Sequence, residues 1–147
     1  MISKLALSAS IVSANPVKMI IDTDMGFDVD DIGSICLANA LMDQGEVDIL
    51  AVVHDTGFIH GIGAVSTINH FYGHEIPLGA YKGVWATNDD AYNAQNKYAQ
   101  SIIEKFPGPV KDYNDVPTAV EVYRKTLAAA EDNSVVISSI GMPTNLR

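Results

Sequence analysis

The sequence is poor in cysteine, in basic residues and in long apolar runs. Cys36 is the only cysteine in 147 residues, so the chain cannot form an internal disulfide or a thiolate metal cluster. Nine lysines and arginines stand against 18 acidic residues, and the formal charge of −9 argues against a nucleic-acid partner. No apolar run approaches the length of a membrane span. The composition therefore predicts a globular protein with neither a nucleic-acid nor a membrane partner.

Acidic residues, by contrast, are concentrated in one segment. Five aspartates fall within ten residues, directly after the apolar run 17–21: Asp22, Asp24, Asp28, Asp30 and Asp31. So many carboxylates at the end of a strand repel one another unless a cation or a polyol ligand compensates their charge. The cluster therefore indicates a binding site in preference to a solvated surface.

The residues around the cluster predict a strand, a loop and a helix. The β-branched run that ends at Ile21 is typical of a buried strand, and Gly26 permits a tight turn. Apolar residues then recur at helical spacing up to Met42, with Gly45 as the helix stop and Cys36 as a buried residue of the helix. This order places the acidic loop at the carboxyl end of a strand, where ligand sites of open α/β sheets usually lie.

Three interpretations of the acidic loop compete. Aspartates commonly cap helices and solvate turns, which needs no ligand. An EF-hand fails on spacing, because Phe27 would occupy the glycine position and Gly33 the glutamate position. A hard-cation site, which takes oxygen ligands and binds Ca²⁺ or Mg²⁺, is the interpretation that we favour.

Two segments of the chain resemble a known enzyme family. Residues 20–31, IIDTDMGFDVDD, resemble the N-terminal signature of the inosine-uridine-preferring nucleoside hydrolases: a strand, Asp-x-Asp, a glycine and then Asp-Asp. Residues 27–29 make this turn two residues longer than in the commonest form. Residues 135–146, VVISSIGMPTNL, resemble the later strand of the family, which is followed by Gly and a Thr-Asn-Leu helix start. The resemblance covers residues 17–147.

The resemblance implies hydrolysis of the N-glycosidic bond of ribonucleosides with Ca²⁺ as cofactor, Mg²⁺ being less favoured. By residue-by-residue matching, Asp24 and Asp31 hold the cation together with the backbone carbonyl of Ile140. Asp24 also takes the proton of the attacking water, which makes it the expected catalytic residue. Asp28 and Asp30 are the expected hydrogen-bond partners of the ribose hydroxyls.

A second strand, predicted over 47–53, delivers His54 and Asp55 to the same edge of the sheet. In the resembling family this loop supplies an Asn to the ribose site, whereas ungapped matching here places Phe58 there. Asp55 or His54 is the expected substitute in substrate binding, with Asp55 favoured. For His54 we favour a structural hydrogen bond over catalysis.

The rest of the chain alternates between helix and strand. The pattern predicts a helix over 62–72, a strand over 76–80, a helix end over 101–106, a helix from Pro117 to about 130 and a strand over 135–137. The expected fold is Rossmann-like α/β: a mostly parallel sheet with helices on both faces, corresponding to the N-terminal part of a nucleoside-hydrolase-like fold. We expect surface or helix-end roles for His60, His70 and His74, and either base stacking or core packing for Trp85.

The two ends of the chain carry separate expectations. Residues 1–16 are interpreted either as a secretory signal or as a disordered extension, which predicts a secreted or periplasmic location in the first case and a cytoplasmic one in the second. Residues 17–147 are the nucleoside-hydrolase-like domain. Members of that family are considerably longer, so the resemblance implies a truncated domain whose remaining ribose contacts, leaving-group acid and last metal-binding Asp lie beyond Arg147.

Two other hypotheses stay open. A strand ending in Asp22-x-Asp24 and a later strand ending in Ser138-Ser139 resemble the first motifs of haloacid-dehalogenase-type phosphohydrolases, which use Mg²⁺ and a nucleophilic Asp. Against this class, Gly26 stands where Thr or Val is usual. The third hypothesis is a non-catalytic fragment that binds a cation or ribose, or a chain that folds as a homo-oligomer.

Overall fold

The computed structural model describes residues 15–83, 97–106 and 108–147. The expected secretory signal, Trp85 and most of the polar stretch 88–100 lie outside the described residues. The elements follow in the order β1 (Val17–Thr23), α1 (Asp30–Asp43), β2 (Val47–His54), α2 (Gly61–Phe71), β3 (Leu78–Ala80), α4 (Lys97–Lys105), a short 3-10 helix (Tyr113–Asp115), α5 (Ala119–Ala128) and β4 (Val135–Ser139).

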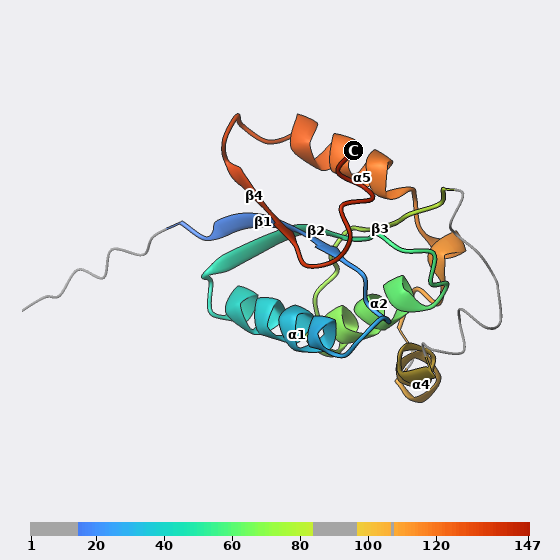
Figure 1. Ribbon diagram of the computed structural model, residues 1–147. Helices are drawn as coiled ribbons and strands as arrows, with labels where there is room; N and C mark the ends of the chain where they lie inside the picture. Colours follow the sequence, from blue (N-terminus) through green and yellow to red (C-terminus); the bar gives the residue numbers. More distant parts are fainter. Residues whose placement is uncertain (1–14, 84–96, 107) are drawn as a thin grey trace, which may run out of the picture.

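The four strands form one parallel sheet in the order β3-β2-β1-β4. The predicted α/β class with a mostly parallel sheet is confirmed. Each crossover returns the chain from the carboxyl end of one strand to the amino end of the next, so all strands end at the same edge. Figure 1 shows α1 and α2 on one face of this sheet and α5 on the other.

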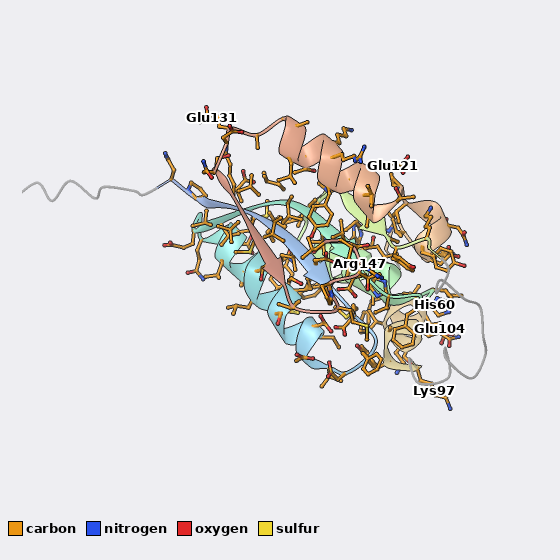
Figure 2. The ribbon with its side chains drawn as sticks, turned by 45° about the horizontal axis from the view of Figure 1, so that its top comes forward. His60, Lys97, Glu104, Glu121, Glu131 and Arg147 are labelled. Carbon is orange, nitrogen blue, oxygen red and sulfur yellow. The ribbon has the colours of Figure 1, made fainter. Side chains whose placement is uncertain are left out.

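Alternate residues of the central strands fill two cores. Ile21, Ile49 and Val52 pack with α1, α2 and α4 on one face, whereas Ile20 and Val53 pack with α5 on the other. Strands buried on both faces read as continuous apolar runs, which is why the runs in β1 and β2 could be identified from the sequence. Figure 2 shows α4, with Lys97 and Glu104, on the opposite side of the molecule from α5, which bears Glu121.

The structure moves several predicted boundaries. β1 continues past Ile21 to Thr23, because Asp22 pairs with β2 on one side and with β4 on the other. Asp22 is therefore a strand residue that is fully buried, although its residue type predicts a loop. The helix α5 is capped by Thr118, whose side chain forms a reciprocal capping box with Glu121, and Pro117 precedes the cap.

Smaller differences concern the end of the chain and Cys36. The expected helix start at 144–146 is a turn, in which the Leu146 amide donates to the Pro143 carbonyl at 3.3 Å. Cys36 is half-buried. Among the described residues, no helix is long and apolar enough to cross a membrane.

Candidate functional site

The register of the sheet brings three loops together where β1, β2 and β4 end. The Ile140 amide donates to the Asp22 carbonyl at 2.8 Å, and the Asp55 amide donates to the Thr23 carbonyl at 3.0 Å. The loops that follow β2 and β4 are thereby tied to the end of β1. We call this region, with Asp22, Asp24, Asp31, Asp55 and the backbone of residues 140–141, the carboxyl edge.

Asp31 stands in the first turn of α1 and is only 1% exposed. Its Oδ1 accepts a hydrogen bond from the Thr23 hydroxyl at 2.5 Å, whereas its Oδ2 has no partner among the described residues. Burial, reinforced by the neighbouring Asp24 carboxylate, raises the pKa of Asp31 to about 7. One buried carboxylate oxygen is thus left without a donor, which is costly unless a ligand supplies one.

Asp55 follows β2 and is also 1% exposed. Neither of its carboxylate oxygens accepts a hydrogen bond of ordinary geometry among the described residues. Burial raises its pKa to about 8, although the nearby backbone of Met142 favours the ionised form and opposes this shift. The charges of Asp22, Asp24 and Asp31 add to the effect of burial. The four carboxylates therefore lie close enough to repel one another, as the sequence predicts for a site that needs a cation.

Asp24 is half-buried and lies against the loop that follows β4. A Cβ atom on Gly141 would stand 2.6 Å from the Asp24 amide nitrogen and 2.4 Å from Asp55 Oδ2, so only glycine fits there. The charge of Asp24 also raises the pKa of Asp31. The structure therefore brings Asp24, Asp31, Asp55 and the backbone next to Ile140 together, although they come from three loops.

Asp28 and Asp30 lie on the exposed outer side of the same loop. Their carboxylate oxygens and one of Asp31 all lie within 4.8 Å of one another, and among the described residues this is the group of three that could hold a metal ion. A hydrogen bond between their carboxyl groups raises the pKa of Asp28 and lowers that of Asp30. The Tyr98 hydroxyl of α4 donates to the Asp28 carbonyl and fixes this part of the loop.

The two predicted ligands therefore differ in their neighbours. Asp31 belongs both to the group with Asp28 and Asp30 and to the carboxyl edge, whereas Asp24 adjoins Asp31 but lies outside the group of three. The assignment of metal ligands to Asp24, Asp31 and the Ile140 carbonyl, and of ribose contacts to Asp28, Asp30 and Asp55, stays a prediction.

Asp22 is fully buried, and both of its carboxylate oxygens accept hydrogen bonds. Oδ2 accepts from the Tyr123 hydroxyl at 2.8 Å, and Oδ1 accepts from the Asn145 amide at 3.0 Å. Burial raises the pKa of Asp22, and these two donors oppose the shift. Sequence reasoning assigned no site role to Tyr123 or Asn145. Asn145 lies in the second motif, but no sequence signal connects Tyr123 with a residue 101 positions away.

His54 and Phe58 are core residues beside the site. His54 Nε2 lies 3.0 Å from the Met25 carbonyl oxygen, and burial lowers the pKa of this histidine, so a neutral ring donates to that carbonyl. Gly61 is required beside it, because a Cβ there would lie 2.1 Å from Nε2. Phe58 is 1% exposed, with its ring centroid 5.9 Å from that of Phe27, so the position matched to the family's Asn carries no polar group.

A cavity of about 720 Å³ lies beneath α5, lined by Leu50, Leu78 and Val122 among others. It contains none of the aspartates of the carboxyl edge. The site is therefore located by its unpaired carboxylates and not by the size of a cavity.

Comparisons with known proteins identify the fold but not a sequence family. No protein-family model matches the chain, and no curated protein matches it by sequence. Two solved structures are similar: that of the effector protein XOO4466 and that of the type III effector protein XopQ complexed with adenosine diphosphate ribose. Each has a TM-score of 0.67 and 14% identity, and each match covers 89% of this chain and 37% of the other.

The similar structures have a nucleoside-hydrolase-like fold, and the described part of this chain shares it. At 14% identity the likeness shows the fold alone. The chain spans just over a third of the length of these two proteins.

Proposed function

We propose that the carboxyl edge binds a hard divalent cation, Ca²⁺ in preference to Mg²⁺, together with the ribose hydroxyls of a nucleoside or a nucleoside derivative. One observation carries the proposal: three buried carboxylate oxygens, Asp31 Oδ2 and both oxygens of Asp55, lack donors within the described residues. Such groups are nearly always satisfied in folded proteins, and carboxylate oxygens are the ligands that Ca²⁺ takes.

The oxygen ligands that the site offers suit a hard cation. Asp24 and Asp31 supply carboxylate oxygens, and the backbone next to Ile140 lies against Asp24, which supports the Ile140 carbonyl as a further ligand. The site has oxygen donors only, because Cys36 lies in α1 away from the loop and His54 faces the Met25 carbonyl. A bound cation would lower the pKa of a water molecule and orient ribose hydroxyls.

We further propose that this site is part of an active site that hydrolyses N-glycosidic bonds. Asp24 is half-buried and therefore within reach of solvent, which supports it as the group that accepts a proton from a water molecule. Asp28 and Asp30 are exposed and can accept hydrogen bonds from hydroxyl groups. The negative charge of the loop would stabilise an oxocarbenium-like sugar. The described residues include none to which protonation of the leaving group is assigned.

Two observations bear on this choice of ligand and reaction. XopQ was solved with adenosine diphosphate ribose, which contains ribose, and its fold is shared by this chain. The rival phosphohydrolase chemistry needs a nucleophilic Asp22, yet Asp22 is fully buried and both of its oxygens are engaged by Tyr123 and Asn145. The nucleoside-type ligand is therefore the better supported one.

The test is a calorimetric titration of chain 1–147 with Ca²⁺, alone and in the presence of ribose or adenosine diphosphate ribose, with ribose release from inosine assayed in the same samples. We expect Ca²⁺ binding by the wild type and its loss in an Asp24→Asn, Asp31→Asn double variant. Asp43→Asn is the matched control, since Asp43 lies at the far end of α1. If the folded wild type does not bind Ca²⁺ at millimolar concentration, the proposal is refuted.

A further inference from the structure

Asp22 differs from the other buried aspartates of the carboxyl edge. Asp31 keeps one oxygen without a partner and Asp55 keeps two, whereas Asp22 is fully buried and both of its oxygens accept a hydrogen bond. The donors are the Tyr123 hydroxyl at 2.8 Å and the Asn145 amide at 3.0 Å. Asp22 is thus the aspartate whose polar groups the protein itself satisfies.

Asn145 makes two bonds with one amide group. Its Nδ2 donates to Asp22 Oδ1 at 3.0 Å and to the His54 carbonyl oxygen at 3.2 Å. An amide nitrogen carries two hydrogens, so both are used. Because Asp22 belongs to β1 and His54 ends β2, this side chain joins the turn after β4 to the ends of both neighbouring strands.

The segment held in this way is the one that touches the proposed cation site. Gly141 lies between the end of β4 and Asn145, and its backbone is packed so closely against Asp24 and Asp55 that a Cβ atom would not fit. At the start of the same segment, the Ile140 amide donates to the Asp22 carbonyl at 2.8 Å. Asp22 thus holds the segment at both ends, through its carbonyl and through its carboxylate.

We propose that Asp22 is a positioning residue and not a cation ligand: with Tyr123 and Asn145 it forms a clamp that sets the backbone of residues 140–141 against Asp24 and Asp55. The inference rests on the proposed cation site. Partners that orient ligands from outside the coordination shell commonly change metal affinity 10- to 100-fold when they are removed.

The experiment compares two clamp variants with a control. Tyr123→Phe removes one hydroxyl and keeps the ring, and Asn145→Ala removes both amide bonds. Thr118→Ala is the control, because it removes the cap of the same helix α5 without touching the clamp. Ca²⁺ affinity is measured by calorimetry, thermal stability by melting, and the exchange of the Ile140 amide hydrogen by NMR.

We expect each clamp variant to bind Ca²⁺ about tenfold more weakly or worse, and to exchange the Ile140 amide faster. Thr118→Ala should lower the melting temperature while leaving Ca²⁺ affinity and Ile140 exchange unchanged. If both clamp variants bind Ca²⁺ like the wild type, the proposal is overturned. If Asp22→Asn alone loses binding while the clamp variants keep it, Asp22 is a ligand and the proposal is again wrong.

Failure of the cation site can be told apart from failure of the clamp. If the wild type binds no Ca²⁺, the proposed function fails, and Ile140 exchange then decides the clamp by itself. Faster exchange in Tyr123→Phe and Asn145→Ala, but not in Thr118→Ala, supports the clamp. Equal exchange in all four proteins overturns it.

Discussion

At the carboxyl edge three buried carboxylate oxygens, Asp31 Oδ2 and both of Asp55, have no donor among the described residues, whereas at the opposite edge, where the strands begin, polar groups of α1, of α2 and of the turn after α2 bond to each other. There Asn39 donates to the Asn69 side chain at 2.8 Å and approaches His74 Nδ1 at 2.7 Å, and His74 Nε2 lies 3.0 Å from Asp43. One amide nitrogen, Asn69 Nδ2, lacks a partner within the described part of the chain. We call this group, Asn39, Asp43, Asn69 and His74, the amino-edge network.

The difference distinguishes polar groups that stabilise the fold by bonding to each other from polar groups that need a ligand. The amino-edge network joins two amides and an imidazole, which carry donors as well as acceptors, to the single carboxylate of Asp43, whose partner is the imidazole, so it is almost complete without a ligand. The carboxylates of the carboxyl edge only accept when ionised, so they cannot satisfy one another, and of the buried ones only Asp22 has donors within the described residues for both of its oxygens. A cation, or protonation, is what the second arrangement needs.

The largest effect on stability and on Ca²⁺ binding is expected for Gly141→Ala, which adds an atom within the carboxyl edge. The new Cβ would lie 2.4 Å from Asp55 Oδ2 and 2.6 Å from the Asp24 backbone nitrogen, so backbone must move. We expect the free energy of unfolding to fall by about 3 kcal/mol and Ca²⁺ binding to be lost. Gly33→Ala is the matched control, because that helical position has nothing within 4 Å, and it should stabilise by about 0.5–1 kcal/mol. Denaturant unfolding with and without Ca²⁺ measures both, and equal stabilities of the two variants would contradict the close contact.

The next effect is the pH dependence of stability without a divalent cation. Asp31 and Asp55 have pKa values raised to about 7 and about 8, so their protonated forms favour the folded state, and this stability disappears as pH rises through those values. The pKa of His54 is lowered, so its opposite effect is confined to pH below its unfolded value. Between about pH 6.5 and 8.5 we therefore expect a loss on the order of 2 kcal/mol.

Saturating Ca²⁺ should abolish this loss, because the ion binds the ionised carboxylates. Thermal melts over the pH series, with EDTA or with Ca²⁺, test this expectation. If stability in EDTA instead rises with pH, the negative charges of these carboxylates are already balanced by other groups of the protein. The two edges would then not differ in their need for a ligand.

A third effect probes the amino-edge network. Asn39→Ala leaves Asn69 Oδ1 and His74 Nδ1 without their partner, and Asn39 itself is fully buried. We expect a loss of about 1–2 kcal/mol in the free energy of unfolding, with Ca²⁺ affinity unchanged. Urea unfolding and calorimetry on the same sample check both halves of this statement. A change in Ca²⁺ affinity would mean that the two edges are coupled.

Sequence reasoning located the acidic loop because five carboxylates after an apolar run are a local signal. It also placed α1, α2 and the parallel strands, whose periodicity is local. It mistook Asp22 for a loop residue, because only tertiary pairing with β2 and β4 keeps an aspartate inside a strand. The contacts of Tyr123 and Asn145 with Asp22 were not predicted for the same reason, because these residues lie 101 and 123 positions from Asp22 in the sequence.

The histidines show the same division. His74 was expected at the surface or at a helix end, and it does follow the end of α2, yet its bonds to Asn39 and Asp43 depend on how α2 packs on α1. The distance of Asp31 from Asp55 likewise depends on strand register, which the hydrophobic pattern constrains only through burial. Contacts between distant segments are therefore the part of the site that composition and periodicity leave open.

The smallest effect is expected for Asp43→Asn, the same substitution that should abolish cation binding when it is made together at Asp24 and Asp31. The Asp43 side chain is 53% exposed and stands in the last turn of α1, where the helix dipole disfavours negative charge. Losing the contact between the Asp43 carboxylate and His74 Nε2 and removing that unfavourable charge have opposite effects on stability, and an Asn oxygen can still accept from the imidazole. We expect the free energy of unfolding to change by less than about 0.5 kcal/mol at pH 7.5, measured by urea unfolding beside the wild type. A fall in the free energy of unfolding well above 1 kcal/mol would mean that the amino-edge network also depends on the charge of a carboxylate. The presence of carboxylate charge would then no longer distinguish the ligand-binding edge from the structural one.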